Sequence, residues 1–142
     1  MPDPLRLRTL LERLDDEVAD LRRLAGYDAA ELLADRDKLK SVKYGFFVAI
    51  EICIDAAQHV IASEGYRAPL NYGDAFAVLA EHGVLSDDDV PTLVAMAGFR
   101  NLLVHGYAAI DDERVVATLH RHLDDFDHFR RVLAREAGDS GL

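Results

Sequence analysis

Residues 100–107 read Arg-Asn-Leu-Leu-Val-His-Gly-Tyr and bring four chemically useful side chains to the end of an apolar segment. On a 3.6-residue period, Arg100 has apolar residues one turn before it and one turn after it. An arginine there is costly unless its planar guanidinium pairs with an anion, either a protein carboxylate or a ligand phosphate. His105, at the negative end of the expected helix dipole, is suited to exchange protons. The segment therefore predicts phosphate binding joined to acid–base chemistry.

The spacing of these residues limits how they can meet. Asn101 is four residues before His105 on the same helical face, where its side chain can orient the imidazole through a hydrogen bond. Arg100 is five residues before His105, about 140° around an ideal helix, so the two do not converge on one straight helix. A frayed last turn, the length of the arginine, or a second copy of the helix across a two-fold axis would each bring them together.

Ionisable residues on the preceding long helix offer a structural alternative. Glu51, Asp55 and His59 recur every four residues and share a helical face. They fit a metal face or an acid–base pair, but we favour a role in anchoring Arg100 or in lining a dimer interface. In the purely structural alternative, Arg100 is a buried ion-pair partner of Glu51 or Asp55, and His105 only caps its helix. The sequence has no cysteine pair with zinc spacing and no glycine-rich phosphate loop, so we predict no metal site and no cofactor.

Composition and charge limit the possible functions. The 142 residues, 50% of them hydrophobic, have the size of one domain that buries its own core. A net charge of −10 argues against a broad basic surface that coats nucleic acid, so any RNA contact must be local. The single Cys53 excludes an internal disulfide framework, and we expect a cytoplasmic protein. Charged and polar residues interrupt the apolar run 44–62, so we expect no membrane association.

Helical periodicity extends along nearly the whole chain and predicts an all-α fold. We expect an up-and-down bundle of four main helices plus short helices, with a single domain over residues 1–137 and a flexible tail over 138–142. The first expected helix covers about residues 5–25. A short helical piece from about residue 28 then leads into a long helix that ends near residue 63. After it we expect a brief helix around 76–80, a helix from about 86 to 105, and a final helix that starts at 111 or 112.

Finer features follow from the same pattern. The long helix carries more apolar surface than a bundle of this size can cover, which predicts a homodimer. Gly106 is well placed to be the left-handed residue that ends its helix. Tyr72 and Asp74 begin the brief helix, where we favour capping over lining a cleft. The final helix should bury one apolar side: Val116, Leu119, Leu123, Phe126 and Leu133.

These residues together resemble the HepT-like branch of the HEPN domains, small helical proteins with an Arg-x4-His-x-Tyr motif. Arg100, His105 and Tyr107 fall on the three motif positions, and Asn101 is the polar residue that commonly follows the arginine. The resemblance extends to residues within 49–60, 69–79 and 83–85. The chain departs from the pattern at Lys43, where relatives often carry an arginine.

The resemblance implies the toxin of a type VII toxin–antitoxin pair and a metal-independent endoribonuclease. His105 would act as general base or acid on an RNA substrate, possible targets being tRNA or mRNA, while Arg100 would hold the scissile phosphate. Because each chain has one motif histidine, acid and base together would require both protomers. The partner would be an MntA-like nucleotidyltransferase antitoxin that transfers AMP to Tyr107 and so obstructs the cleft. The alternative is a non-catalytic, nucleotide-binding or accessory subunit of a minimal nucleotidyltransferase, which suits an acidic surface better.

Overall fold

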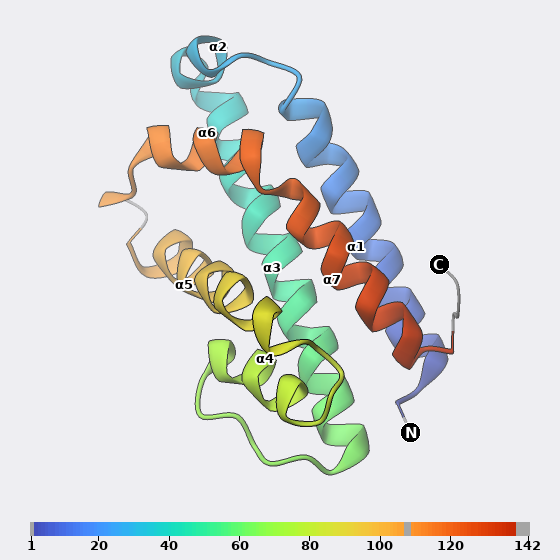
Figure 1. The fold of residues 1–142 in the computed structure, drawn as a ribbon. Helices are drawn as coiled ribbons and strands as arrows, with labels where there is room; N and C mark the ends of the chain where they lie inside the picture. The colour runs from blue at the N-terminus through green and yellow to red at the C-terminus, as the bar shows by residue number, and fades with distance from the viewer. Residues whose placement is uncertain (1, 107–108, 139–142) are drawn as a thin grey trace.

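All regular structure in the described part of the chain is helical. The computed structural model describes residues 2–106 and 109–138, and no residue in these ranges belongs to a β-strand. The elements, labelled in Figure 1, are α1 (Pro4–Leu24), α2 (Ala29–Ala34), α3 (Arg36–Glu64), α4 (Tyr72–Glu81), the 3-10 turn η1 (Asp87–Asp89), α5 (Val90–His105), α6 (Asp112–Arg121) and α7 (Leu123–Glu136). The prediction of an all-α bundle is confirmed. The single domain and its tail stay a prediction, since residues 139–142 lie outside the described ranges.

The long helices begin at aspartate caps. The side chain of Asp3 accepts hydrogen bonds from the backbone N–H groups of Leu5 and Arg6 at the start of α1. Asp35 does the same for Asp37 and Lys38 at the start of α3. These caps satisfy N–H groups that the first helical turn leaves unpaired. The far end of α3 is closed by Gly65 at φ 71°, a backbone conformation that glycine adopts without steric cost.

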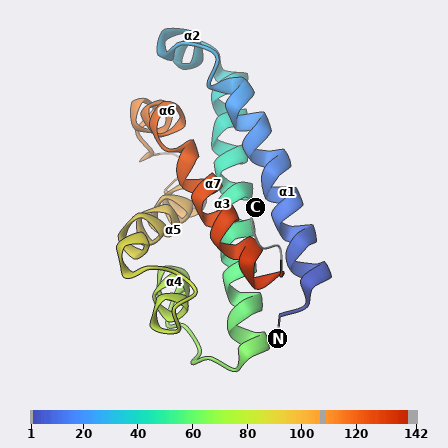
Figure 2. The same cartoon turned by 45° about the vertical axis from the view of Figure 1, so that its right-hand side comes forward.

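Helix α3 is the centre of the bundle. Figures 1 and 2 show α1 and α7 on one side of α3, α4 and α5 on the other, and α2 and α6 at one end. Gly45 lets α1 approach closely, because a Cβ at this position would lie 2.8 Å from Cδ2 of Leu21. Helix α3 is long and apolar enough to cross a membrane, but 61% of its most apolar window is buried inside the protein. Its hydropathy therefore has a structural explanation as the core helix of the bundle.

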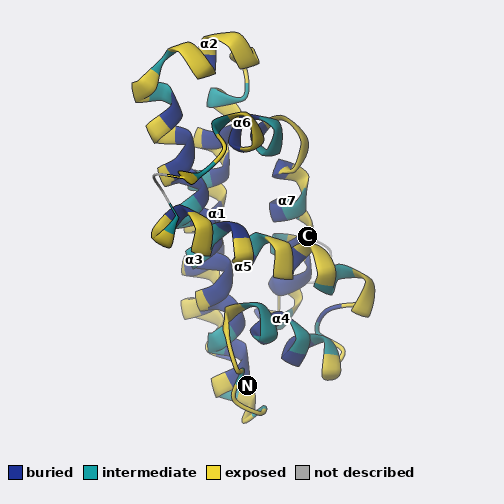
Figure 3. Ribbon diagram, turned by 90° about the vertical axis from the view of Figure 1, so that its left-hand side faces the viewer, coloured by how far each residue is buried: buried dark blue, intermediate teal, exposed yellow. Residues whose placement is uncertain are grey.

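The burial of α3 contradicts the reason for which we predicted a homodimer. The surplus of apolar surface expected on the long helix is not found, because α3 is covered by its neighbours and 14 of its residues are buried. Large hydrophobic residues are exposed on several elements, Tyr44 on α3 among them, and three of them lie on α5, which has exposed positions along its length (Figure 3). Val94, Leu102 and Val104 are each about two-fifths exposed, at 43%, 40% and 42%. The homodimer itself stays a prediction.

The C-terminal region differs from the single final helix that we expected. The chain breaks at His122, whose backbone at φ −121° and ψ 10° is not helical, and α6 turns away from the axis of α7. The predicted buried side of this region is nevertheless confirmed at all five positions: Val116, Leu119, Leu123, Phe126 and Leu133. A second expectation is wrong, since Gly106 ends α5 at φ −113° rather than in the left-handed region.

Candidate active site at the end of α5

Helix α5 is positioned at its start by η1 and along its length by buried aromatic packing. Ser86 and Asp89 form a reciprocal capping box, and Pro91 occupies the first turn of α5, where a missing N–H costs nothing. Further along, the Phe99 ring meets the Phe46 ring of α3 edge to face, with centroids 5.3 Å apart. Leu103 is buried one turn later. These contacts fix the rotation of α5, so that Arg100 faces α3 and α4.

Arg100 of α5 is held by residues of two other helices, α3 and α4. Its side chain is 13% exposed, and Nε donates a hydrogen bond of 2.5 Å to Oε1 of Glu51 on α3. The guanidinium carbon lies 4.8 Å from the ring centroid of Tyr72 on α4 and 5.6 Å from that of Phe47 on α3. Nη1 donates to Oδ1 of Asn101 at 3.1 Å. Nη2 forms no hydrogen bond with any residue in the described ranges, so this edge of the guanidinium can receive a ligand oxygen.

The two candidate carboxylates, Glu51 and Asp55, have different surroundings. Glu51 pairs with Arg100, as the structural alternative anticipated, whereas Asp55 is exposed and does not. The charges that act on Asp55 are those of Glu51 and of Arg6 and Arg13 on α1. Partial burial, followed by the nearby Glu51, raises the pKa of Asp55 above its ordinary value. Of this pair, only Glu51 belongs to the candidate site.

His105 and Asn101 lie outward. His105 is the last residue of α5 and is exposed, and its ring forms no hydrogen bond with a residue that the structure describes. Asn101 is also exposed, and its side-chain oxygen accepts from Arg100 rather than orienting the histidine. Arg100 and His105 are therefore not brought together within one chain. Tyr107 lies outside the described residues.

Two aromatic contributors to the site were missed or misread in the sequence. The sequence favours helix capping over cleft lining for Tyr72, but Asn71 is the residue that caps α4, and Tyr72 lies against the guanidinium of Arg100. Phe47 was not singled out, although its position one turn before Glu51 on α3 places both on the same face. Asp74 is part of a structural network instead: it pairs with Arg67 and accepts the backbone N–H of Leu70. Its bonds with Arg67 lower the pKa of Asp74 to about 2.

Lys43, the position at which the chain departs from the motif pattern, joins α3 to the start of α6. The residue is 8% exposed, and its Nζ lies 2.7 Å from Oδ1 of Asp112. A buried ammonium group is tolerated when a carboxylate partners it. This ion pair therefore ties the first turn of α6 to the central helix α3.

The remaining histidines have structural contacts. His59 Nε2 accepts the backbone N–H of Asp3, His120 contacts the carbonyl oxygen of Tyr27, and His128 lies 3.0 Å from a carboxylate oxygen of Asp89. Over residues 2–106 and 109–138, no group of three or more His, Cys, Asp or Glu side chains is arranged to hold a metal ion.

Comparison with known proteins identifies the family of this chain. Residues 14–133 match the profile of the family described as ribonuclease HepT-like. The chain belongs to the HepT-like family. This HepT-like chain is similar to the mRNA nuclease HepT of Shewanella oneidensis, with 33% identity over 86 residues that make up 61% of this chain. The match spans 65% of the length of that relative.

Two solved structures share the fold along nearly the whole HepT-like chain. One is the tri-AMPylated HEPN toxin of Shewanella oneidensis in complex with its MNT antitoxin, with a TM-score of 0.85, 25% identity, and coverage of 95% of this chain and 99% of that one. The other is a chain in the structure of a mutant MntA toxin–antitoxin complex, with a TM-score of 0.84, 23% identity, and coverage of 94% of this chain and 99% of that one. The second likeness concerns the fold alone.

Proposed function

We propose that this HepT-like chain is the toxin of a toxin–antitoxin pair and acts as an endoribonuclease without a metal ion. The observation that carries the proposal is the state of Arg100. Its guanidinium is fixed by Glu51, Tyr72 and Phe47, yet its Nη2 edge has no partner in the described chain. A cation that is held in place but only partly used is suited to stabilise charge that develops on a phosphate.

A homodimer through α5 would supply the histidine that Arg100 lacks in its own chain. Val94, Gly98, Asn101, Leu102 and His105 fall within about 100° of one another around this helix. All five are exposed, and Gly98 has no atom within 4 Å of the place that a Cβ would take. A second α5 packed across a two-fold axis would cover the exposed Val94 and Leu102 and would bring two copies of His105 to one cleft.

The proposed reaction then proceeds by attack of a ribose 2′-hydroxyl on the neighbouring phosphorus. One His105 takes the proton of the 2′-hydroxyl as the new O–P bond forms. The second His105 gives its proton to the 5′-oxygen as the old P–O bond breaks. Arg100 binds the non-bridging oxygens, whose negative charge grows in the transition state. The products are an RNA end with a 2′,3′-cyclic phosphate and an RNA end with a 5′-hydroxyl.

The proposed partner is a nucleotidyltransferase antitoxin that transfers AMP to Tyr107. The AMPylated toxin that shares this fold supports this part of the proposal. An AMP group two residues from His105 would add negative charge beside the cleft and would repel an RNA phosphate. The alternative, a nucleotide-binding or accessory subunit that does not cut RNA, is favoured by the net charge of −10.

A matched pair of histidine variants tests the proposal. Induced alone, the wild-type protein should arrest growth, and the purified protein should cut RNA in the presence of EDTA to leave 2′,3′-cyclic phosphate ends. His105→Ala should abolish both effects, while His82→Ala, at the opposite end of α4 from Tyr72, should keep them. RNA cleavage by His105→Ala at the wild-type rate would overturn the catalytic proposal, and the absence of cleavage by the wild type would favour the accessory subunit.

A further inference from the structure

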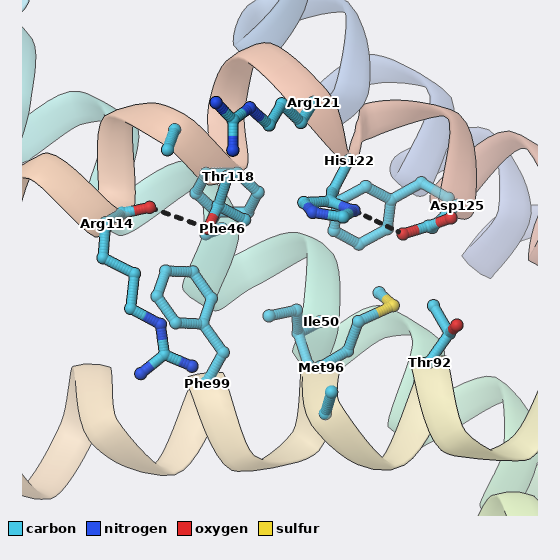
Figure 4. A pocket seen from close by; sticks show the side chains of 13 residues that line it. Phe46, Ile50, Thr92, Met96, Phe99, Arg114, Thr118, Arg121, His122 and Asp125 are labelled. Atoms are coloured by element: carbon cyan, nitrogen blue, oxygen red, sulfur yellow. Dashed lines mark hydrogen bonds and ion pairs between the residues drawn. The ribbon is translucent and has the colours of Figure 1, made fainter.

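A cavity that is separate from the Arg100 site lies between α5, α6 and α7. It has a volume of 490 Å³, within the range of small-molecule sites. Side chains from α3 form its floor, and Figure 4 shows the opening between α5 below and α6 and α7 above. None of the residues proposed for RNA cleavage lines it.

The floor of this cavity is apolar and aromatic. Phe46, Ile50, Met96, Phe99 and Phe126 contribute to it, and four of these five are buried in the core. Because the floor is recessed behind the helices, a flat protein surface cannot reach it, whereas an inserted ring can. Phenyl rings and a methionine thioether make favourable contacts with a planar aromatic group, and the flexible methionine adapts to its shape.

The rim of the cavity carries unpaired positive charge. Arg114 and Arg121 lie on the same face of α6, seven residues apart, and both line the cavity. Neither guanidinium forms an ion pair or a hydrogen bond with any residue described by the structure. The imidazole of His122 also lines the cavity and lies 3.3 Å from a carboxylate oxygen of Asp125, as the dashed line in Figure 4 marks. In a protein of net charge −10, two arginines without carboxylate partners beside one cavity are suited to an external anion.

We propose that this cavity binds a small organic anion with a planar aromatic body and a carboxylate or phosphate head. The aromatic body enters between α5 and α6 and contacts the rings of Phe46 and Phe99. The anionic head stays at the rim, where the guanidinium of Arg114, which points toward Phe99 in Figure 4, donates hydrogen bonds to its oxygens and Arg121 adds positive charge. Thr92 on α5 lines the same cavity and adds a hydroxyl group at the opposite wall.

The sequence supplies a specific reporter for the test. The chain has only two methionines, Met1 and Met96, and Met96 lines the cavity. With 13C-methyl methionine, the spectrum of the whole protein contains two methyl signals, and Met96→Leu assigns them. The probes share one ring system: 1-naphthoate carries a carboxylate, 1-naphthyl phosphate carries a phosphate, and 1-naphthylmethanol carries no charge. Inorganic phosphate tests whether the anionic head group binds without the ring system.

We expect at least one of the two anionic probes to shift the Met96 signal in a saturable way, and the tighter of the two identifies the head group. Arg114→Ala should weaken binding roughly tenfold, as expected for loss of a charge-assisted hydrogen bond, and Arg121→Ala should weaken it less, because only positive charge is lost. Arg131→Ala removes an exposed cation of α7 outside the cavity and should leave binding unchanged.

Three results would overturn the proposal. The first is that neither anionic probe shifts the Met96 signal, and the second is that 1-naphthylmethanol binds as tightly as the anions. The third is a Met96 signal that moves with protein concentration instead of probe concentration, which would assign the cavity to a second copy of the chain. RNA cleavage is not measured in this experiment, so its outcome is independent of the proposed nuclease activity.

Discussion

Arg100 and Glu51 form an ion pair that ties the end of α5 to the central helix α3, with Nε 2.5 Å from Oε1. The pair uses one edge of the guanidinium, and Asn101 uses Nη1. Nη2 remains available among the described residues. The structural and the catalytic interpretations of Arg100 are therefore compatible, since the carboxylate positions the cation without consuming all of its donors.

Glu51→Gln should lower the free energy of unfolding by about 1–2 kcal/mol, because a largely buried guanidinium loses its anionic partner. Asp55→Asn, a change of the same kind one turn along α3, should be neutral or slightly stabilising at pH 7. The raised pKa of Asp55 shows that folding disfavours its charged form, so removal of the charge relieves a cost. Denaturant unfolding of both variants measures the difference, and equal losses would contradict the assigned pairing.

Tyr72→Ala should reduce both RNA cleavage and stability, with a stability loss of about 0.5–1 kcal/mol from the missing cation–π contact. Tyr72→Phe should retain both properties, because the guanidinium of Arg100 lies over the ring face. Cleavage rate and thermal midpoint are compared for the two variants. Loss of cleavage in Tyr72→Phe, with a normal midpoint, would instead assign a role to the hydroxyl group.

Gly98→Leu should weaken self-association roughly tenfold or more, because a bulky side chain would separate two closely packed α5 helices. The same change should not lower the stability of the monomer. Nothing lies within 4 Å of a Cβ at Gly98, and leucine favours a helix more than glycine does. Sedimentation velocity over a concentration series measures the association. An unchanged dimer would place the interface on another face.

The Arg67–Asp74 ion pair should make α4 sensitive to acid. A folded pKa of about 2 for Asp74, below its ordinary 3.8, means that the stabilisation is fully present above pH 4 and is lost as the pH falls toward 2. Asp74→Asn should therefore have a lower Tm than the wild type at pH 6, and the gap should close between pH 4 and pH 2. Thermal unfolding at several pH values measures this gap, and a gap that persists at pH 2 would exclude Asp74 as its source.

Apolar periodicity was sufficient to predict the helices because each one buries a continuous stripe. It did not predict the break at His122. The apolar positions Leu119, Leu123 and Phe126 keep a helical spacing across this residue, and no proline or glycine interrupts them. The break depends on tertiary packing, since α6 contacts α2 and α3 while α7 packs mainly on α1. Local sequence carries no information on that choice.

In the site, too, the features that depend on local sequence could be predicted and those that depend on tertiary packing could not. A counter-charge for Arg100 could be predicted, because an arginine on an apolar face needs an anion and Glu51 lies on the neighbouring long helix. The contact with Tyr72 could not be predicted, since it depends on the relative rotation of α4 and α5. The expected surplus of apolar surface on α3 failed for a related reason: the number of helices that surround α3 is a property of the topology.

The change of direction at His122 has a consequence for comparisons within the family. If the chain continued as one straight helix through this residue, α6 would extend along the axis of α7, and the cavity between α5 and α6 would lose the wall that α6 forms. The hollow beside α5 in this chain therefore depends on the bend at His122. Among sequences of this fold, an uninterrupted helix over the equivalent positions should accompany loss of the paired arginines, and that correlation can be read without an assay.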